Sequence, residues 1–189
     1  FFINDSHPLA NAVVSLADGR LRVVEAVYGP GLETPGMGVR DGQYYARNYG
    51  QLAFALPFLW AFRALGVVVD PGLLLPTCWS LLVVALGAQT GRYLDRPSQG
   101  ATAGAACGLV AFLANVGVAA PLSPELLPVA AHQAASTVAA ALAVVTLYRL
   151  VARIHGPRFG FAAGAVTALA TPVGFWASIP KRHTFVLAL

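Results

Sequence analysis

The segment LLPVAAHQAASTVAAALAVVTLYRL, residues 126–150, decides the fold of this chain. It contains no acidic or basic residue before Arg149, apart from one histidine, His132. An apolar run of about 20 residues is long enough to cross the hydrocarbon core of a bilayer as an α-helix. The segment therefore predicts a transmembrane helix.

Three further apolar runs of similar length cover residues 73–90, 101–120 and 159–179. The whole chain is 57% hydrophobic and 11% charged, whereas soluble domains carry about 25% charged residues. Lipid can solvate this much apolar surface, but a soluble domain of 189 residues cannot bury it. The predicted fold is an all-α, polytopic transmembrane helical bundle with an external first loop that carries juxtamembrane helices.

Both ends of the sequence indicate a fragment of a longer chain. Phe1-Phe2-Ile3 resembles the end of a preceding helix, and residues 185–189 resemble the start of another. We predict two parts: residues 1–70 as the external loop with juxtamembrane helices, and residues 71–189 as about four complete spans with the start of a fifth.

Residues 4–50 are the one long polar stretch. They contain turn-forming glycine and proline pairs and no apolar run of about 20 residues, so they do not span. Within them, residues 8–16 predict a short surface helix. Residues 21–27 either continue that helix or form a short extended piece.

Residues 52–69 are ambiguous, because they are apolar but contain Pro57 and Arg63. Positive residues gather on the cytoplasmic side of membrane proteins. If 52–69 does not span, five arginines fall on one side and the 4–50 loop on the other. These arginines are Arg92, Arg96, Arg149, Arg153 and Arg158. We therefore predict a juxtamembrane or re-entrant helix at 52–69, in a multi-pass protein of the cell membrane with the 4–50 loop external.

Polar groups suited to chemistry gather on that external side. They are Asp5, the stretch from Arg40 to Gly50, and Lys181-Arg182-His183. A carboxylate there can act as a general base, and cations can hold a lipid phosphate. The ordinary alternatives are a loop acid, basic anchors at helix ends and an aromatic belt. The dispersed basic residues predict no nucleic-acid partner, and no cofactor is predicted. A divalent metal is possible but is not supported by any ligand spacing in the sequence.

The sequence resembles the N-terminal part of the GT-C superfamily of membrane glycosyltransferases, which includes protein mannosyltransferases and aminoarabinose transferases. One feature is an acid, Asp5, directly after the first helix and before a short surface segment. A second is DGQYYARNYGQLAFALPF, residues 41–58, which is similar to a family stretch that leads into a proline-containing apolar helix. A third is the helix pair at 142–153 and 162–176, with LYRL at 147–150 and ATP at 170–172.

The resemblance implies transfer of a sugar from a polyprenyl-phosphate-linked donor to an acceptor on the external face. The acceptor, whether protein, lipid or glycan, is not defined, and membrane lipids surround the enzyme. Asp5 is the expected catalytic carboxylate, with Asp41 as the alternative. The expected donor-phosphate contacts are Arg40, Arg47, Lys181 and Arg182, and the sugar or interface contacts are Tyr44, Tyr45 and His183. The competing hypothesis is a non-enzymatic membrane protein, either a transporter or an assembly subunit.

Overall fold

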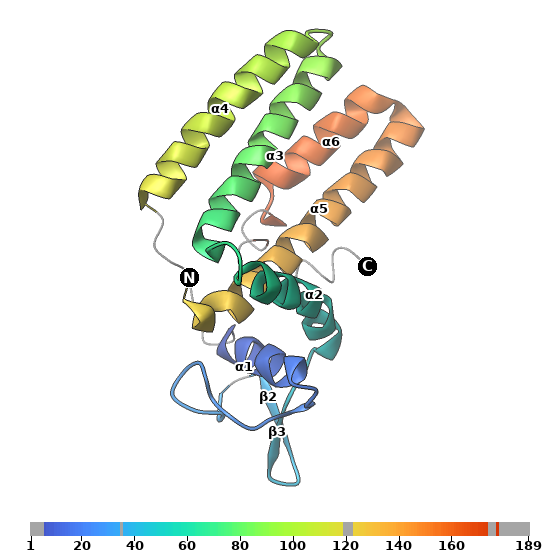
Figure 1. Ribbon diagram of the computed structural model, residues 1–189. Helices are drawn as coiled ribbons and strands as arrows, with labels where there is room; N and C mark the ends of the chain where they lie inside the picture. Colours follow the sequence, from blue (N-terminus) through green and yellow to red (C-terminus); the bar gives the residue numbers. More distant parts are fainter. Residues whose placement is uncertain (1–5, 35, 119–122, 174–176, 178–189) are drawn as a thin grey trace. The chain divides into compact units, whose positions relative to one another are not determined.

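A computed structural model describes residues 6–34, 36–118, 123–173 and 177 (Figure 1). The described chain is mostly helical and also contains a small antiparallel sheet. It divides into two compact units, one made of Phe1–Ala61 with Glu125–Leu189 and the other of Phe62–Pro124. The two units are described separately below.

The Phe62–Pro124 unit is a hairpin of two long helices, α3 (Pro71–Tyr93) and α4 (Pro97–Val118) (Figure 1). The α3 helix starts where it does because the Asp70 carboxylate accepts a hydrogen bond from the backbone N–H of Gly72, at 2.7 Å, and satisfies one of the free N–H groups of the first turn. These helices confirm the predicted apolar runs at 73–90 and 101–120.

Five glycines form the contact between α3 and α4, at four-residue spacing in each helix. They are Gly87 and Gly91 on α3, and Gly100, Gly104 and Gly108 on α4. A Cβ atom added to Gly87 would lie 2.4 Å from the Cα atom of Gly104, and one added to Gly91 would lie 2.6 Å from the Cα atom of Gly100. The two backbones are therefore in direct contact, as small residues allow between helices in lipid.

In the other unit, α5 (Leu127–His155) and α6 (Pro157–Ala170) form a second hairpin, and the short 3₁₀ turn η1 (Pro124–Leu126) precedes α5 (Figure 1). The sharp turn between the helices lies at Gly156, whose φ of 92° favours glycine. The α5 helix confirms the predicted span at 126–150.

The fourth predicted span, at 159–179, is described only up to residue 173 and at residue 177. The α6 helix has 14 residues and ends at Ala170, which is shorter than a span by itself, so the predicted span stays a prediction. The helix ends there because Thr171 precedes Pro172, and Thr171 has the extended backbone (φ −116°, ψ 165°) that a following proline favours. Residues 174–176 and 178–189, which hold the rest of this run and the start of the predicted fifth helix, lie outside the described residues.

Three helices in the described part of the chain are long and apolar enough to cross a membrane: residues Gly72–Tyr93, Pro97–Val118 and Pro124–His155. The protein is therefore a multi-pass membrane protein by the length and composition of these helices. The α2 helix (Tyr49–Leu65) has 17 residues and is not among them. That residues 52–69 lie along the membrane surface, with the preceding loop outside, stays a prediction.

The short helix predicted at 8–16 is confirmed as α1 (Ser6–Ala17), and its place at the membrane surface stays a prediction. It is followed by β1 (Arg22–Val23), β2 (Met37–Arg40) and β3 (Gln43–Ala46), which form one antiparallel sheet in the order β1-β3-β2. The extended alternative for residues 21–27 is thus correct at β1. The sheet also corrects the all-α prediction, because two strands fall where only loop was expected.

One side chain of α1 and one of α2 hold these helices to the loop and to the sheet. The buried Asn11 of α1 donates from Nδ2 to the Tyr28 carbonyl at 3.0 Å and accepts from the Tyr28 N–H at 2.8 Å. The Tyr49 hydroxyl, in the first turn of α2, donates to the carbonyl of Leu21 and accepts from the N–H of Ala46. These hydrogen bonds connect the loop and the sheet, which carries the β2–β3 hairpin, to α1 and α2.

Candidate functional site: a cavity on the β2–β3 hairpin

The hairpin turn is made by Asp41 and Gly42, which have φ values of 52° and 70°. Left-handed backbone at both central residues defines a type I′ turn, for which Asp-Gly is a favoured pair. The closing pair is Arg40 with Gln43. This turn gives Asp41 a structural reason to be at its position, independent of any catalytic role.

A two-residue turn fixes which side chains share a face of the hairpin, since faces alternate along each strand. Met37 lies opposite Ala46, and both are buried. Gly38 lies opposite Tyr45, one residue further along each strand. Gly38, Arg40 and Tyr45 therefore belong to the outward face.

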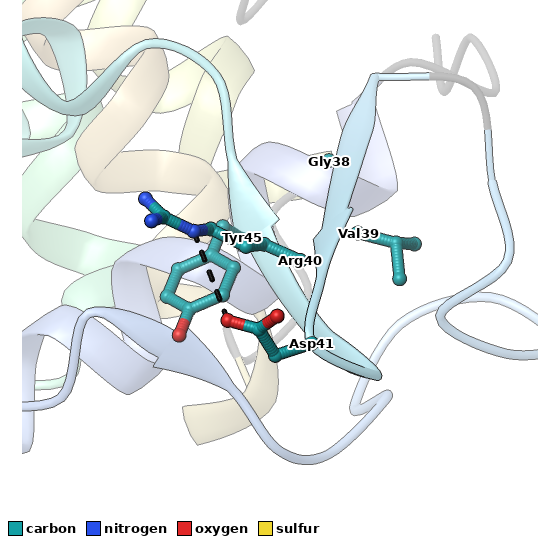
Figure 2. Close-up of a pocket in the computed structure, with 5 residues that line it drawn as sticks. All are labelled: Gly38, Val39, Arg40, Asp41 and Tyr45. Carbon is teal, nitrogen blue, oxygen red and sulfur yellow. Dashed lines mark ion pairs between the residues drawn. The ribbon is translucent and has the colours of Figure 1, made fainter.

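An open cavity of about 450 Å³ lies on the hairpin and is lined by Gly38, Val39, Arg40, Asp41 and Tyr45 (Figure 2). Because Gly38 has no side chain, nothing on β2 directly opposite Tyr45 covers the ring. The Arg40 Nε and Asp41 Oδ2 atoms are 3.8 Å apart, and the two side chains are 86% and 91% exposed. Such an exposed pair contributes little to stability, so both groups remain available to a ligand.

An aromatic ring, a guanidinium group and a carboxylate line the cavity, and the charges of the last two cancel. A sugar suits this combination, because its apolar face packs on a tyrosine ring while its hydroxyls donate to a carboxylate and accept from a guanidinium group. A phosphate suits it less well. Arg40 would attract a phosphate, but Asp41 would repel it at nearly the same distance. The predicted contact of Arg40 with the donor phosphate stays a prediction.

Two of the predicted residues in this stretch do not line the cavity. Tyr44 lies on the opposite face of the hairpin from Tyr45, and its hydroxyl donates to Glu33 Oε1 at 3.1 Å. That hydrogen bond raises the pKa of the Tyr44 phenol, with smaller contributions from desolvation and from the charge of Glu33. Arg47 lies beyond the end of β3, and its Nη2 donates to the Met37 carbonyl over a long 3.5 Å.

The remaining predicted site residues are Asp5, Lys181, Arg182 and His183, and all four lie outside the described residues. Their relation to the cavity therefore stays a prediction. Within the described ranges, no cluster of three or more histidine, cysteine or acidic side chains could hold a metal ion.

Gly38 and Arg22, on the outward face, are not among the predicted site residues. Gly38 presents no side chain opposite Tyr45 on β2, and Arg22 is the partner of Tyr45 on β1. Both could be found only from the strand register. The Asp41-Gly42 pair was the available signal for β2, because a two-residue turn at this pair places Gly38 opposite Tyr45.

Comparison of the chain with protein-family models, with curated proteins and with solved structures found no match. The resemblance to the GT-C superfamily therefore rests on the sequence features described above and stays a prediction.

Proposed function

We propose that this chain is part of a GT-C-type membrane glycosyltransferase that transfers a sugar from a polyprenyl-phosphate donor to an acceptor on the external face. The observation that carries the proposal is the hairpin cavity, where Arg40, Asp41 and the partly exposed ring of Tyr45 meet. Three helices long enough to span a membrane are consistent with a lipid-linked donor.

In the proposed reaction, the bond between the sugar anomeric carbon and the donor phosphate breaks. A bond from that carbon to the acceptor oxygen or nitrogen forms, and the polyprenyl phosphate leaves. A carboxylate takes the proton that the acceptor loses. Asp5 is the proposed base, because the resemblance expects the acid directly after the first helix. Asp41 is the alternative, and in either case the ring of Tyr45 stacks on the transferred sugar or on the acceptor.

The test measures sugar transfer by the full-length protein from polyprenyl-phosphate donors that carry different sugars. Asp5→Asn and Asp41→Asn each remove one base and keep the side-chain size, and asparagine also tolerates the left-handed backbone at position 41. Loss of a general base lowers the rate by about 100- to 10,000-fold. We expect this loss in the Asp5 variant. A loss confined to the Asp41 variant transfers the role to Asp41, and normal transfer by both variants refutes the catalytic assignment.

Tyr45 provides a separate test of the cavity. Tyr45→Phe keeps the ring, and we expect it to retain transfer with little change in KM. Tyr45→Leu removes the ring, and we expect KM for the sugar-bearing substrate to rise. Tyr44→Leu is the matched control, because Tyr44 is the neighbouring tyrosine and does not line the cavity. Equal effects of the two leucine variants would show that the cavity is not a sugar site.

A further inference from the structure

An open groove of about 500 Å³ (the α3–α4 groove) follows the line where α3 and α4 meet. Its lining residues all belong to the Phe62–Pro124 unit. Its floor is backbone, because four of the contact glycines line it: Gly87, Gly91, Gly100 and Gly104. With no side chains on this line, the two helices touch at the floor and the flanking side chains form the walls.

The walls of the groove change from apolar to polar along its length. Val83, Leu86, Ala103 and Cys107 line the apolar end, whereas Thr90, Gln99 and Arg96 line the end near the turn between the helices. The wall residues Leu86 and Leu94 are 67% and 60% exposed. The groove is therefore accessible from outside this unit, and it is amphipathic along its axis.

Arg96 supplies a positive charge at the polar end. Its backbone is fixed, since its N–H donates to the Gly91 carbonyl at 2.7 Å and its carbonyl accepts from the Gly100 N–H at 3.0 Å. Its side chain is exposed and forms no ion pair or hydrogen bond with the residues that the structure describes. Asp95 is the acid of the same turn, and residues 92–96, with two arginines and one aspartate, have a net charge of +1. The polar end therefore suits an anion.

The length of the groove matches the depth of one lipid leaflet. The 23 residues of α3 span about 34.5 Å at 1.5 Å per residue, and the hydrocarbon core is about 30 Å thick. A centred α3 that crosses along the membrane normal therefore has the turn at the headgroups. Leu94 follows Val83 by 11 residues, or about 16.5 Å along the axis. The groove thus runs from the headgroups to about the middle of the bilayer.

We propose that the α3–α4 groove binds one anionic phospholipid, with its phosphate on Arg96 and an acyl chain over the glycine floor. A guanidinium group forms strong, charge-assisted hydrogen bonds to a phosphate. The methylene groups of the chain gain contacts with the exposed backbone and the apolar walls. An apolar helix in the groove would leave Arg96 without an anion, whereas a lipid supplies the chain and the phosphate in one molecule. This site does not depend on the proposed glycosyl transfer.

The experiment measures thermal unfolding of the full-length protein in phosphatidylcholine nanodiscs with an increasing fraction of phosphatidylglycerol that has the same acyl chains. Choline cancels the charge of the phosphate in the first lipid, and glycerol leaves it in the second. A ligand that binds the folded state alone raises the unfolding temperature. We expect phosphatidylglycerol to raise it by several degrees and to saturate at a small fraction. Soluble glycerol phosphate, which has no acyl chain, should give no comparable shift.

Variants locate the effect. Arg96→Gln should lose most of the shift. Arg92→Gln is the matched control, because it removes the same charge from the same turn and Arg92 does not line the groove, so it should keep the shift. Ala103→Leu places a larger side chain in the wall and should also lose the shift, since it excludes the acyl chain. Arg96→Gln keeps the backbone hydrogen bonds of Arg96 and decides the outcome if Ala103→Leu does not fold.

Four outcomes overturn the proposal. Phosphatidylglycerol gives no shift, or the Arg96 and Arg92 variants lose it equally, which indicates unspecific attraction of anionic lipid. Glycerol phosphate gives the full shift, which indicates a site for a free anion. Ala103→Leu folds and keeps the full shift, so that no chain lies in the groove. The protein is dimeric in phosphatidylcholine alone and Ala103→Leu makes it monomeric, which indicates that a second copy occupies the groove.

Discussion

Replacing Gly87 with alanine should force α3 and α4 apart. The added Cβ atom would lie 2.4 Å from the Cα atom of Gly104, whereas carbon atoms pack best at about 3.5–4.0 Å. The contacting atom belongs to the backbone, so it cannot move aside like the end of a flexible side chain. The two helices must separate by roughly 1 Å to relieve the clash.

The energetic cost follows from that separation. A gap of about 0.5–1 Å removes a quarter to a half of the attraction between the atoms on either side, and overpacking of this kind costs about 1–3 kcal/mol. Alanine offsets up to about 1 kcal/mol of this through its better helix propensity. We expect a net loss of about 1–2 kcal/mol in the free energy of unfolding.

The assay is equilibrium unfolding of the full-length protein in mixed micelles as the fraction of denaturing detergent increases. Gly117→Ala in α4 is the control, because a Cβ atom there would meet nothing within 4 Å, and its stability should be unchanged or slightly higher. The double variant Gly87→Ala with Gly104→Ala should lose less than the sum of the single losses, since the two sites touch. Equal stability of Gly87→Ala and Gly117→Ala would refute the close packing of the two helices.

Two further predictions concern the loop before α2. Asn11→Ala leaves the N–H and carbonyl of Tyr28 without their partner, so it should lower the free energy of unfolding by about 1–3 kcal/mol in chemical denaturation, and an unchanged value would contradict the buried pair. Glu33→Gln should lower the pKa of Tyr44, because the hydrogen bond to Glu33 is the main cause of its increase. A difference titration of phenolate absorbance measures this change, and identical curves would exclude the Glu33–Tyr44 contact. The raised pKa also means that the contact stabilises the loop while Tyr44 is protonated and that this contribution is lost as the pH rises through the pKa of the folded protein.

Hydropathy alone was sufficient to predict the long helices, because a span in lipid needs only length and apolar composition. It did not predict the break at Thr171, where the following proline ends α6 inside a run that is otherwise apolar. Hydropathy also missed the sheet. Its strands have four residues or fewer, and such short segments contain no long apolar run. The Asp41-Gly42 turn could have revealed β2 and β3, but that pair was interpreted through a family resemblance instead of its backbone geometry.

The candidate site was predictable only in part. Arg40, Asp41 and Tyr45 were named from the chemistry of their side chains, and the structure brings them to one cavity. Tyr44 and Arg47 were named on the same grounds, but strand alternation and the end of β3 direct them elsewhere. Sequence chemistry identifies which groups can react or bind, whereas the faces of a hairpin determine which of them meet.

The two hydrogen bonds of Tyr49 have a mechanical consequence. Its hydroxyl bridges the chain just before β1 and the last residue of β3, while its backbone belongs to the first turn of α2. A displacement of the sheet is therefore transmitted through one rigid aromatic ring to the start of α2. The direction in which α2 leaves the sheet therefore depends on a single side chain, at the point where the polar loop passes into the apolar helix.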